Sequence, residues 1–258
     1  MESSRLKLRG VLTVGVIGVA LGVGDLVQRL VIGPLVHILP KRRIPILTWW
    51  ERLFAINIIR AARIVGGASI LEPPALPGGE GILVLMNHQS LMDIPLVVAA
   101  LPTTYPRIVT RARYARGKPV ISHMVRLYQY PVVDPTSKTR DQLESIAEAA
   151  KTSPVPLMIF PEGTRTRDGE IGIWREGGLR AILGARVWTV HLLVADGYWQ
   201  TARLPDFIDK VGTIDGRAVA LGPFTSPDPG TDPEPFITEM RQRMIAGLAS
   251  LRGAAKAS

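Results

Sequence analysis

The sequence predicts an α/β fold, with a mostly parallel central sheet flanked by helices and an N-terminal apolar helical region ahead of it. Short apolar runs alternate with helical segments from residue 81 to about 224, which is the order that produces parallel strands. Two of these runs, 81–86 and 155–160, are apolar throughout, as in strands that are covered on both faces. The N-terminal region is indicated by an uncharged apolar run from Val11 to Gly24.

Length and composition divide the chain into three segments. At 258 residues it is long enough for one α/β domain with an appendage. We expect a basic, apolar helical membrane anchor region over 1–65 and an α/β domain over 66–225. A proline-rich linker and a C-terminal helix are expected over 226–258.

The N-terminal segment has two apolar runs, 11–24 and 30–40, separated by polar residues at 25–29. The first run is shorter than the roughly 20 residues that a spanning helix needs. We therefore expect two short helices that dip into one leaflet, or one tilted anchor, with the basic residues 41–43 and the tryptophans 49–50 at the interface. A cleaved signal peptide and a buried helix of a soluble protein are the alternatives.

Charge also indicates a membrane partner. Residues 1–65 hold ten Lys and Arg against three Asp and Glu, so this quarter carries 10 − 3 = +7 of the net charge of +9. Cations beside an apolar segment are attracted to anionic lipid by about 1 kcal/mol each. Their position favours an anionic membrane surface over nucleic acid as the partner. The chain has no cysteine, which excludes disulfides and thiolate metal sites.

Beyond the anchor region, the pattern predicts six strands and two well-marked helices. A helix is expected from about residue 139, and another over 235–252 with Met240, Met244, Leu248 and Leu251 on one docking side. The strands are expected over 81–86, 106–110, 129–133, 155–160, 187–195 and 217–222.

The segment from Asn87 to Asp93 follows the apolar run 81–86 directly. His88 therefore falls at the carboxyl end of a predicted strand, where open α/β sheets bind ligands. Asp93 falls at or near a helix N-cap, because Pro95 fits only the first helical turn. A carboxylate on one imidazole nitrogen would prepare the other to take a proton from a hydroxyl. The simpler interpretation is an ordinary helix cap.

A second polar segment, Phe160 to Arg165, ends the run 155–160 and reaches the same predicted edge. The planar guanidinium of Arg165 suits a phosphate, and Gly163 allows close backbone approach. The simpler interpretation is a solvated turn with a local Glu–Arg pair. Taken together, the two segments indicate an acyl-transfer site.

The two segments resemble the signature of the lysophospholipid or 1-acylglycerol-3-phosphate acyltransferases. That signature is Asn-His-x4-Asp followed further along by Phe-Pro-Glu-Gly-Thr-Arg, and both blocks match in full, 162 − 88 = 74 residues apart from His88 to Glu162. The resemblance covers about 44–224. It implies transfer of a fatty acyl group from acyl-CoA or acyl carrier protein to a lysophospholipid hydroxyl, most directly that of 1-acylglycerol-3-phosphate, giving phosphatidic acid.

The resemblance also implies roles at the matching positions. His88 is the expected general base and Asp93 its orienting partner. Arg165 is expected on the acceptor phosphate, and Arg111 as a second phosphate ligand. No metal, no cofactor beyond the acyl cosubstrate and no covalent enzyme intermediate are expected, and the location is the cytoplasmic face of the inner or plasma membrane. The full set of expected substrate-binding residues is Asn87, Arg111, Glu162, Gly163, Thr164 and Arg165.

Two departures from the family pattern leave the acceptor open. Asp134 is followed by Pro135 where the family has an arginine, which Lys138 or Arg140 would have to replace. The strand over 187–192 lacks the prolines of the family's fourth block. Transfer to glycerol-3-phosphate or to another lysolipid is the alternative, as is a non-catalytic membrane-binding protein with the same fold.

Other chemistries lack their motifs. There is no Gly-x-Ser-x-Gly elbow for a serine hydrolase, and no glycine fingerprint follows the first predicted strand. Metal catalysis would require His88 to converge with other ligands such as His123 or His191.

Overall fold

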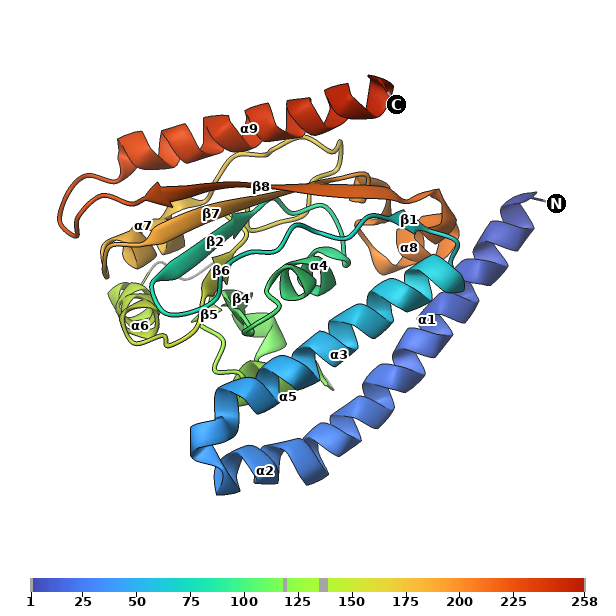
Figure 1. Ribbon diagram of the computed structural model, residues 1–258, viewed down its shortest axis with the longest axis horizontal. Coiled ribbons are helices and arrows are strands. Elements are labelled where there is room, and N and C mark those ends of the chain that lie inside the picture. Colours follow the sequence, from blue (N-terminus) through green and yellow to red (C-terminus); the bar gives the residue numbers. More distant parts are fainter. Residues whose placement is uncertain (1, 118–119, 135–138, 258) are drawn as a thin grey trace.

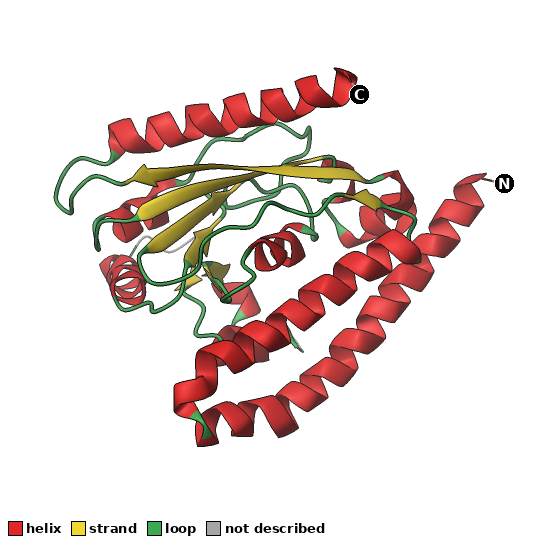
Figure 2. Ribbon diagram, in the orientation of Figure 1, coloured by secondary structure: helices red, strands yellow, loops and turns green. Residues whose placement is uncertain are grey.

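The computed structural model describes residues 2–117, 120–134 and 139–257. Its centre is a six-stranded sheet in the order β1-β8-β7-β2-β6-β3, with helices on both faces (Figure 1, Figure 2). A separate small sheet pairs β4 (Thr110–Arg111) with β5 (Val132–Val133). The strands of the main sheet are β1 (Ser69–Ile70), β2 (Ile82–Met86), β3 (Arg107–Ile108), β6 (Leu157–Ile159), β7 (Thr189–Asp196) and β8 (Asp215–Thr225).

Neighbouring strands are parallel except for β7 and β8. Val84 in β2 lies opposite Met158 in β6 and His191 in β7, so the carboxyl ends of these three parallel strands reach one edge of the sheet. The α/β class with a mostly parallel sheet is therefore confirmed. Strands also lie within the predicted runs 81–86 and 155–160, as their continuous apolar character indicates.

The predicted strand over 129–133 is wrong for most of its length. Helix α5 (Ile121–Leu127) ends just before it, and Gln129 takes a left-handed backbone conformation with φ of 53°. Tyr130 then turns into the core, and only β5 is extended, outside the main sheet. The predicted strand over 106–110 is divided in the same way, because β3 joins the main sheet and β4 leaves it.

Alternate residues of the central strands enter two cores. Val84 and Met86 face a core that also contains α3 (Arg43–Ile64), α4 (Asp93–Ala100) and α5. Leu83 and Leu85 face a second core, built with α6 (Arg140–Lys151), α7 (Glu176–Leu183) and α9 (Glu234–Ala257). This burial on both faces explains why β2 is apolar at every position.

The N-terminal helices form a hairpin. Helix α1 (Glu2–Val27), a π-helical turn (Gln28–Ile32) and α2 (Gly33–Ile38) follow one another without a break, and α3 returns beside them (Figure 1). The expected pair of short helices separated by the polar residues 25–29 is therefore wrong. Asp25 and Arg29 pair along the helix at 2.8 Å, and the buried Gln28 accepts a hydrogen bond from Trp50 Nε1 at 3.1 Å.

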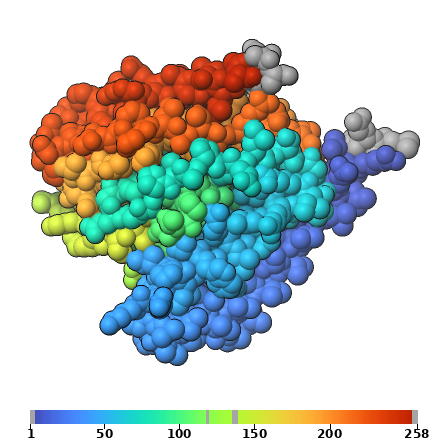
Figure 3. All heavy atoms as spheres, in the orientation of Figure 1, coloured from blue at the N-terminus to red at the C-terminus, as the bar shows by residue number. Residues whose placement is uncertain are grey.

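The segment Ser4–Ile38 is long and apolar enough to cross a membrane, and only 17% of its most apolar stretch is buried. Figure 3 shows α1 and α3 forming one side of the molecule. The continuous helical run from α1 to α2 nevertheless packs on the rest of the protein at both ends. Gly10 lies against the backbone of Ile208 in α8 (Leu204–Lys210), and Ile32 and Val36 are buried in the first core. The hairpin and the α/β domain thus share a core.

Helix α9 lies across the opposite face of the sheet (Figure 1). Met240, Met244 and Leu248 are buried in the second core, with Leu251 packed beside them. The predicted terminal helix and its docking face are confirmed.

A buried carboxyl group joins α3 to the α/β domain. Glu51 is 3% exposed and accepts a hydrogen bond from the hydroxyl of Tyr130, while its Oε2 has no partner among the described residues. Burial raises the pKa of Glu51 to about 8, against the opposing effect of the Tyr130 hydrogen bond. The folded protein therefore holds a proton on Glu51 at neutral pH that the unfolded chain releases.

We expect the free energy of unfolding to fall as pH rises from about 5 to about 9. The proton that Glu51 binds more tightly in the folded state stabilises the fold, and this stabilisation is lost as pH rises through the folded-state pKa. Glu51→Gln keeps an acceptor for Tyr130 and does not titrate, so this part of the pH dependence should disappear. Urea unfolding of both proteins at the two pH values measures it. If the free energies of unfolding of the wild type and Glu51→Gln differ by the same amount at both pH values, the raised pKa of Glu51 is contradicted.

Candidate active site

Three loops meet at the carboxyl edge of the sheet. They are residues 87–92 after β2, 160–175 after β6 and 197–203 after β7. Direct hydrogen bonds join them: Thr166 N–H donates to His88 O at 2.8 Å, and Ser90 Oγ donates to Thr201 O at 3.0 Å. The parallel register therefore brings together segments that are far apart in sequence.

The first loop holds a histidine–carboxylate pair. His88 Nδ1 lies 2.7 Å from Asp93 Oδ2, and Asp93 is the first residue of α4 and fully buried. The same Oδ2 accepts the backbone N–H groups of Gln89 at 2.6 Å and Ser90 at 2.8 Å. Because this oxygen is an acceptor, Nδ1 carries the proton, and the lone pair on Nε2 is available as a base.

The imidazole is also fixed by its neighbours. Its ring stacks on Phe160, with centroids 3.9 Å apart and planes 18° apart. Only 15% of the His88 side chain is exposed. The ring therefore has one orientation, set by Asp93 on its edge and by Phe160 on its face.

Glu162 acts on the backbone of the histidine loop. Its Oε1 accepts His88 N–H at 3.0 Å and its Oε2 accepts Gly172 N–H at 2.9 Å. Burial raises its pKa, partly offset by these two hydrogen bonds. Glu162 is expected from the sequence to bind the acceptor; in the structure both carboxylate oxygens accept backbone N–H groups and the residue is 4% exposed, and acceptor binding by Glu162 stays a prediction.

Comparisons with known proteins agree with this geometry. A family model described as Acyltransferase matches residues 68–193. Residues 68–193 belong to the acyltransferase family. The whole chain is similar in fold to the 1-acyl-sn-glycerophosphate (LPA) acyltransferase PlsC from Thermotoga maritima, with a TM-score of 0.72, 20% sequence identity and coverage of 97% of this chain and 99% of that one. No curated protein gives a significant match.

Asn87 also makes contacts that position the histidine loop. Its side-chain amide donates to Ala195 O and accepts from Ala195 N–H, each at 2.8 Å. The residue is 2% exposed. The expectation that Asn87 binds substrate stays a prediction. The amide ties the start of the histidine loop to β7.

Arginines gather around the turn at Gly163, whose φ is 63°. Arg111 donates from Nη2 to Gly163 O, and the side chain of Arg175 lies against the Cα of Gly163. Desolvation lowers the pKa of Arg111, and the nearby charges of Arg113, Arg175 and Arg165 lower it further. Such a group of like charges favours an anion between them.

Two further members of the expected acceptor turn lie beside this arginine cluster. Arg165 donates Nη1 to Ala202 O at 2.7 Å, and its buried Nε has no partner among the described residues. Thr164 is exposed. Arg111 from β4, Arg165 from the turn and Arg175 from the start of α7 thus come together near Gly163, and Arg175 is the member that sequence motifs mark least clearly.

Of the two residues expected to replace the family's missing arginine, Lys138, like Pro135, lies outside the described residues, and Arg140 does not enter this cluster. Arg140 donates to Glu144 on its own helix at 2.7 Å, and its side chain is 91% exposed. Asp134 is instead held through its backbone by the amide of Gln142, at 2.8 and 3.1 Å.

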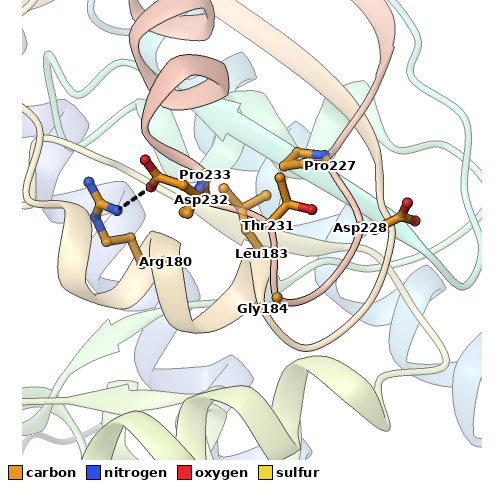
Figure 4. A pocket seen from close by; sticks show the side chains of 9 residues that line it. Arg180, Leu183, Gly184, Pro227, Asp228, Thr231, Asp232 and Pro233 are labelled. Atoms are coloured by element: carbon orange, nitrogen blue, oxygen red, sulfur yellow. Dashed lines mark hydrogen bonds and ion pairs between the residues drawn. The ribbon is translucent and has the colours of Figure 1, made fainter.

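The described histidines do not converge on His88, and no group of three or more metal-binding side chains occurs in the described part of the chain. Figure 4 shows a surface hollow of about 430 Å³ between α7 and residues 227–233, where Arg180 pairs with Asp232 at 3.4 Å. None of the active-site residues lines this hollow.

We expect Glu162→Gln to lower the free energy of unfolding by about 1–3 kcal/mol, because the amide leaves one buried N–H donor without an acceptor. Chemical denaturation measures the change. Glu72→Gln is the control, since Glu72 is exposed. Equal stability of the two variants would contradict the positioning role of Glu162.

Proposed function

We propose that this protein is an O-acyltransferase that moves a fatty acyl group from a thioester to the hydroxyl of a lysophospholipid, most directly 1-acylglycerol-3-phosphate, giving phosphatidic acid. The observation that carries the proposal is the His88–Asp93 pair, whose Nδ1 is occupied at 2.7 Å and whose Nε2 is available. The membership of 68–193 in the acyltransferase family supports it. Acyl-CoA and acyl carrier protein are the candidate donors.

In the proposed reaction, His88 Nε2 takes the proton of the acceptor hydroxyl as its oxygen attacks the thioester carbonyl. Asp93 keeps Nδ1 protonated and stabilises the imidazolium that forms. The C–S bond then breaks, and the departing thiolate takes the proton from His88. The acyl group passes directly to the acceptor, so the reaction needs neither a covalent acyl-enzyme nor a metal.

The acceptor phosphate is proposed to bind the arginine cluster. Arg111, Arg165 and Arg175 surround Gly163, and fixed guanidinium groups make strong charge-assisted hydrogen bonds to phosphate. Glycerol-3-phosphate carries the same phosphate, so the cluster alone does not distinguish the two acceptors. A lysolipid with another head group is the third candidate.

The membrane is proposed to cover α1 and α3 at its cytoplasmic face. Val19, Leu30, Trp49 and Ile64 are each more than half exposed, and an apolar groove of about 560 Å³ runs between the two helices. Because the helical run from α1 to α2 packs on the rest of the protein at both ends, we propose that the hairpin lies in one leaflet rather than spanning the bilayer. This position brings the enzyme to a lipid acceptor.

The test is thiol release from a long-chain acyl-CoA by protein in detergent, with and without lysophosphatidic acid, repeated with glycerol-3-phosphate, other lysolipids and acyl carrier protein thioesters. We expect acceptor-dependent release from the wild type. In His88→Ala, turnover should fall by at least about 100-fold, because general-base catalysis contributes roughly 10²–10⁴-fold. Vesicle binding should be unchanged. Absence of release with every donor and acceptor would contradict the proposal.

Arg165→Ala should raise the acceptor KM by about 10–100-fold, because a hydrogen bond to a charged group contributes roughly 1.5–3 kcal/mol. The donor KM should change little. Arg167→Ala is the matched control, since Arg167 is exposed on the same loop. An unchanged acceptor KM in Arg165→Ala would remove Arg165 from the phosphate site.

A further inference from the structure

The loop over 160–175 contains no helix or strand, although it carries Glu162 and Arg165. Its position therefore depends on individual hydrogen bonds. Two of these bonds, from Thr166 N–H to His88 O and from His88 N–H to Glu162, fix it to the histidine loop. Something outside both loops must hold this pair in place.

Helix α9 supplies that support through two arginines. Arg241 donates to Gly172 O at 3.1 Å and to Ile171 O at 3.4 Å. Gly172 is the residue whose N–H binds Glu162. Arg241 therefore fixes the backbone of Gly172, which binds the carboxylate of Glu162. Glu162 in turn binds the backbone N–H of His88.

Arg252 binds the residues of the loop that directly precede Ile171. It donates to Gly169 O at 2.9 Å and to both oxygens of Asp196, at 3.0 and 3.3 Å, and it pairs with Glu170 at 2.5 Å. Gly169 has φ of 86°, and an added Cβ would lie 3.0 Å from Arg252 Nη2. A glycine is thus required where the arginine approaches the loop.

The contact at Arg252 reaches the catalytic pair through Gln89. The side-chain Nε2 of this fully buried residue donates to Gly169 O at 3.3 Å and to Asp196 Oδ1 at 3.2 Å, and its Oε1 accepts Tyr198 N–H at 3.1 Å. Only one orientation of the amide satisfies all three bonds. The backbone N–H of Gln89 donates to Asp93 Oδ2, the oxygen that binds His88.

We propose that Arg241 and Arg252 are positioning residues of the active site, by which the C-terminal helix clamps the 160–175 loop against the His88 loop. The kinetic part of this proposal rests on the proposed acyl transfer. The two arginines are 252 − 241 = 11 residues apart, so they lie about 20° apart around α9, on one face. Arg243 lies about 200° from Arg241 and pairs with Glu239 on its own helix at 2.6 Å.

A merely structural role would make both arginines equivalent to Arg243, which also attaches α9, because its guanidinium lies 4.7 Å from the centroid of the Phe224 ring in β8. The clamp predicts different results for Arg241→Ala and Arg252→Ala on one side and Arg243→Ala on the other. Arg252→Lys is a conservative variant that keeps a charge for Asp196 but lacks the planar fork, so it should recover part of the effect.

The first measurement is hydrogen–deuterium exchange in the purified full chain, which does not require activity. We expect peptides covering 88–93 and 162–172 to exchange roughly tenfold faster in the two clamp variants, as the loss of about one net hydrogen bond implies. The same peptides should be unchanged in Arg243→Ala. Unchanged exchange in the clamp variants, or equal acceleration in Arg243→Ala, would overturn the proposal.

The second measurement is kcat and KM in the thiol-release assay, at a temperature where every variant is folded. We expect kcat to fall by about 10–100-fold in the clamp variants, because misplacing a catalytic group by about 1 Å costs up to that factor. Arg243→Ala should keep wild-type kcat, and Arg252→Lys should lie between. Faster exchange with unchanged kcat would overturn the positioning role. A wild type without turnover would refute the proposed function. The exchange data alone would then show whether Arg241 and Arg252 fix the 160–175 loop.

Discussion

A single carboxylate oxygen organises the centre of this protein. Asp93 Oδ2 accepts His88 Nδ1 and the backbone N–H groups of Gln89 and Ser90. Three donors on one buried oxygen close the turn between β2 and α4 and select the tautomer of His88. The loop geometry and the availability of Nε2 thus have one cause, and the other two loops are built around this arrangement.

Most polar side chains at the site bind protein rather than substrate. Asn87 joins the histidine loop to β7, and Glu162 joins it to the loop after β6. Buried polar groups require partners, and these partners come from strands that are adjacent only in the folded sheet. The groups left for a ligand are Nε2 of His88 and the guanidinium groups near Gly163. Within the two sequence blocks, Asn87 and Glu162 thus bind the protein backbone, while His88 and Arg165 keep groups that are available to a ligand.

The sequence predicts a strand correctly where both of its faces are buried. The prediction fails where a single local contact sets the backbone conformation. Strands such as β2 were predictable because both faces are covered, whereas 129–131 is not a strand because Gln129 turns left-handed and Tyr130 binds Glu51. The contact between His88 and Asp93 was predictable from spacing within one loop. The partners of Asn87 and Glu162 were not, since they are set by strand order, and no motif marks Arg252.

Different helices cover the two faces of the sheet. The hairpin of α1 and α3 covers one core and leaves exposed apolar side chains, while α9 covers the other and reaches the active-site loops with arginines. Helix α9 therefore supports the active-site loops from the face of the sheet opposite the hairpin, and leaves the exposed apolar side chains of α1 and α3 uncovered.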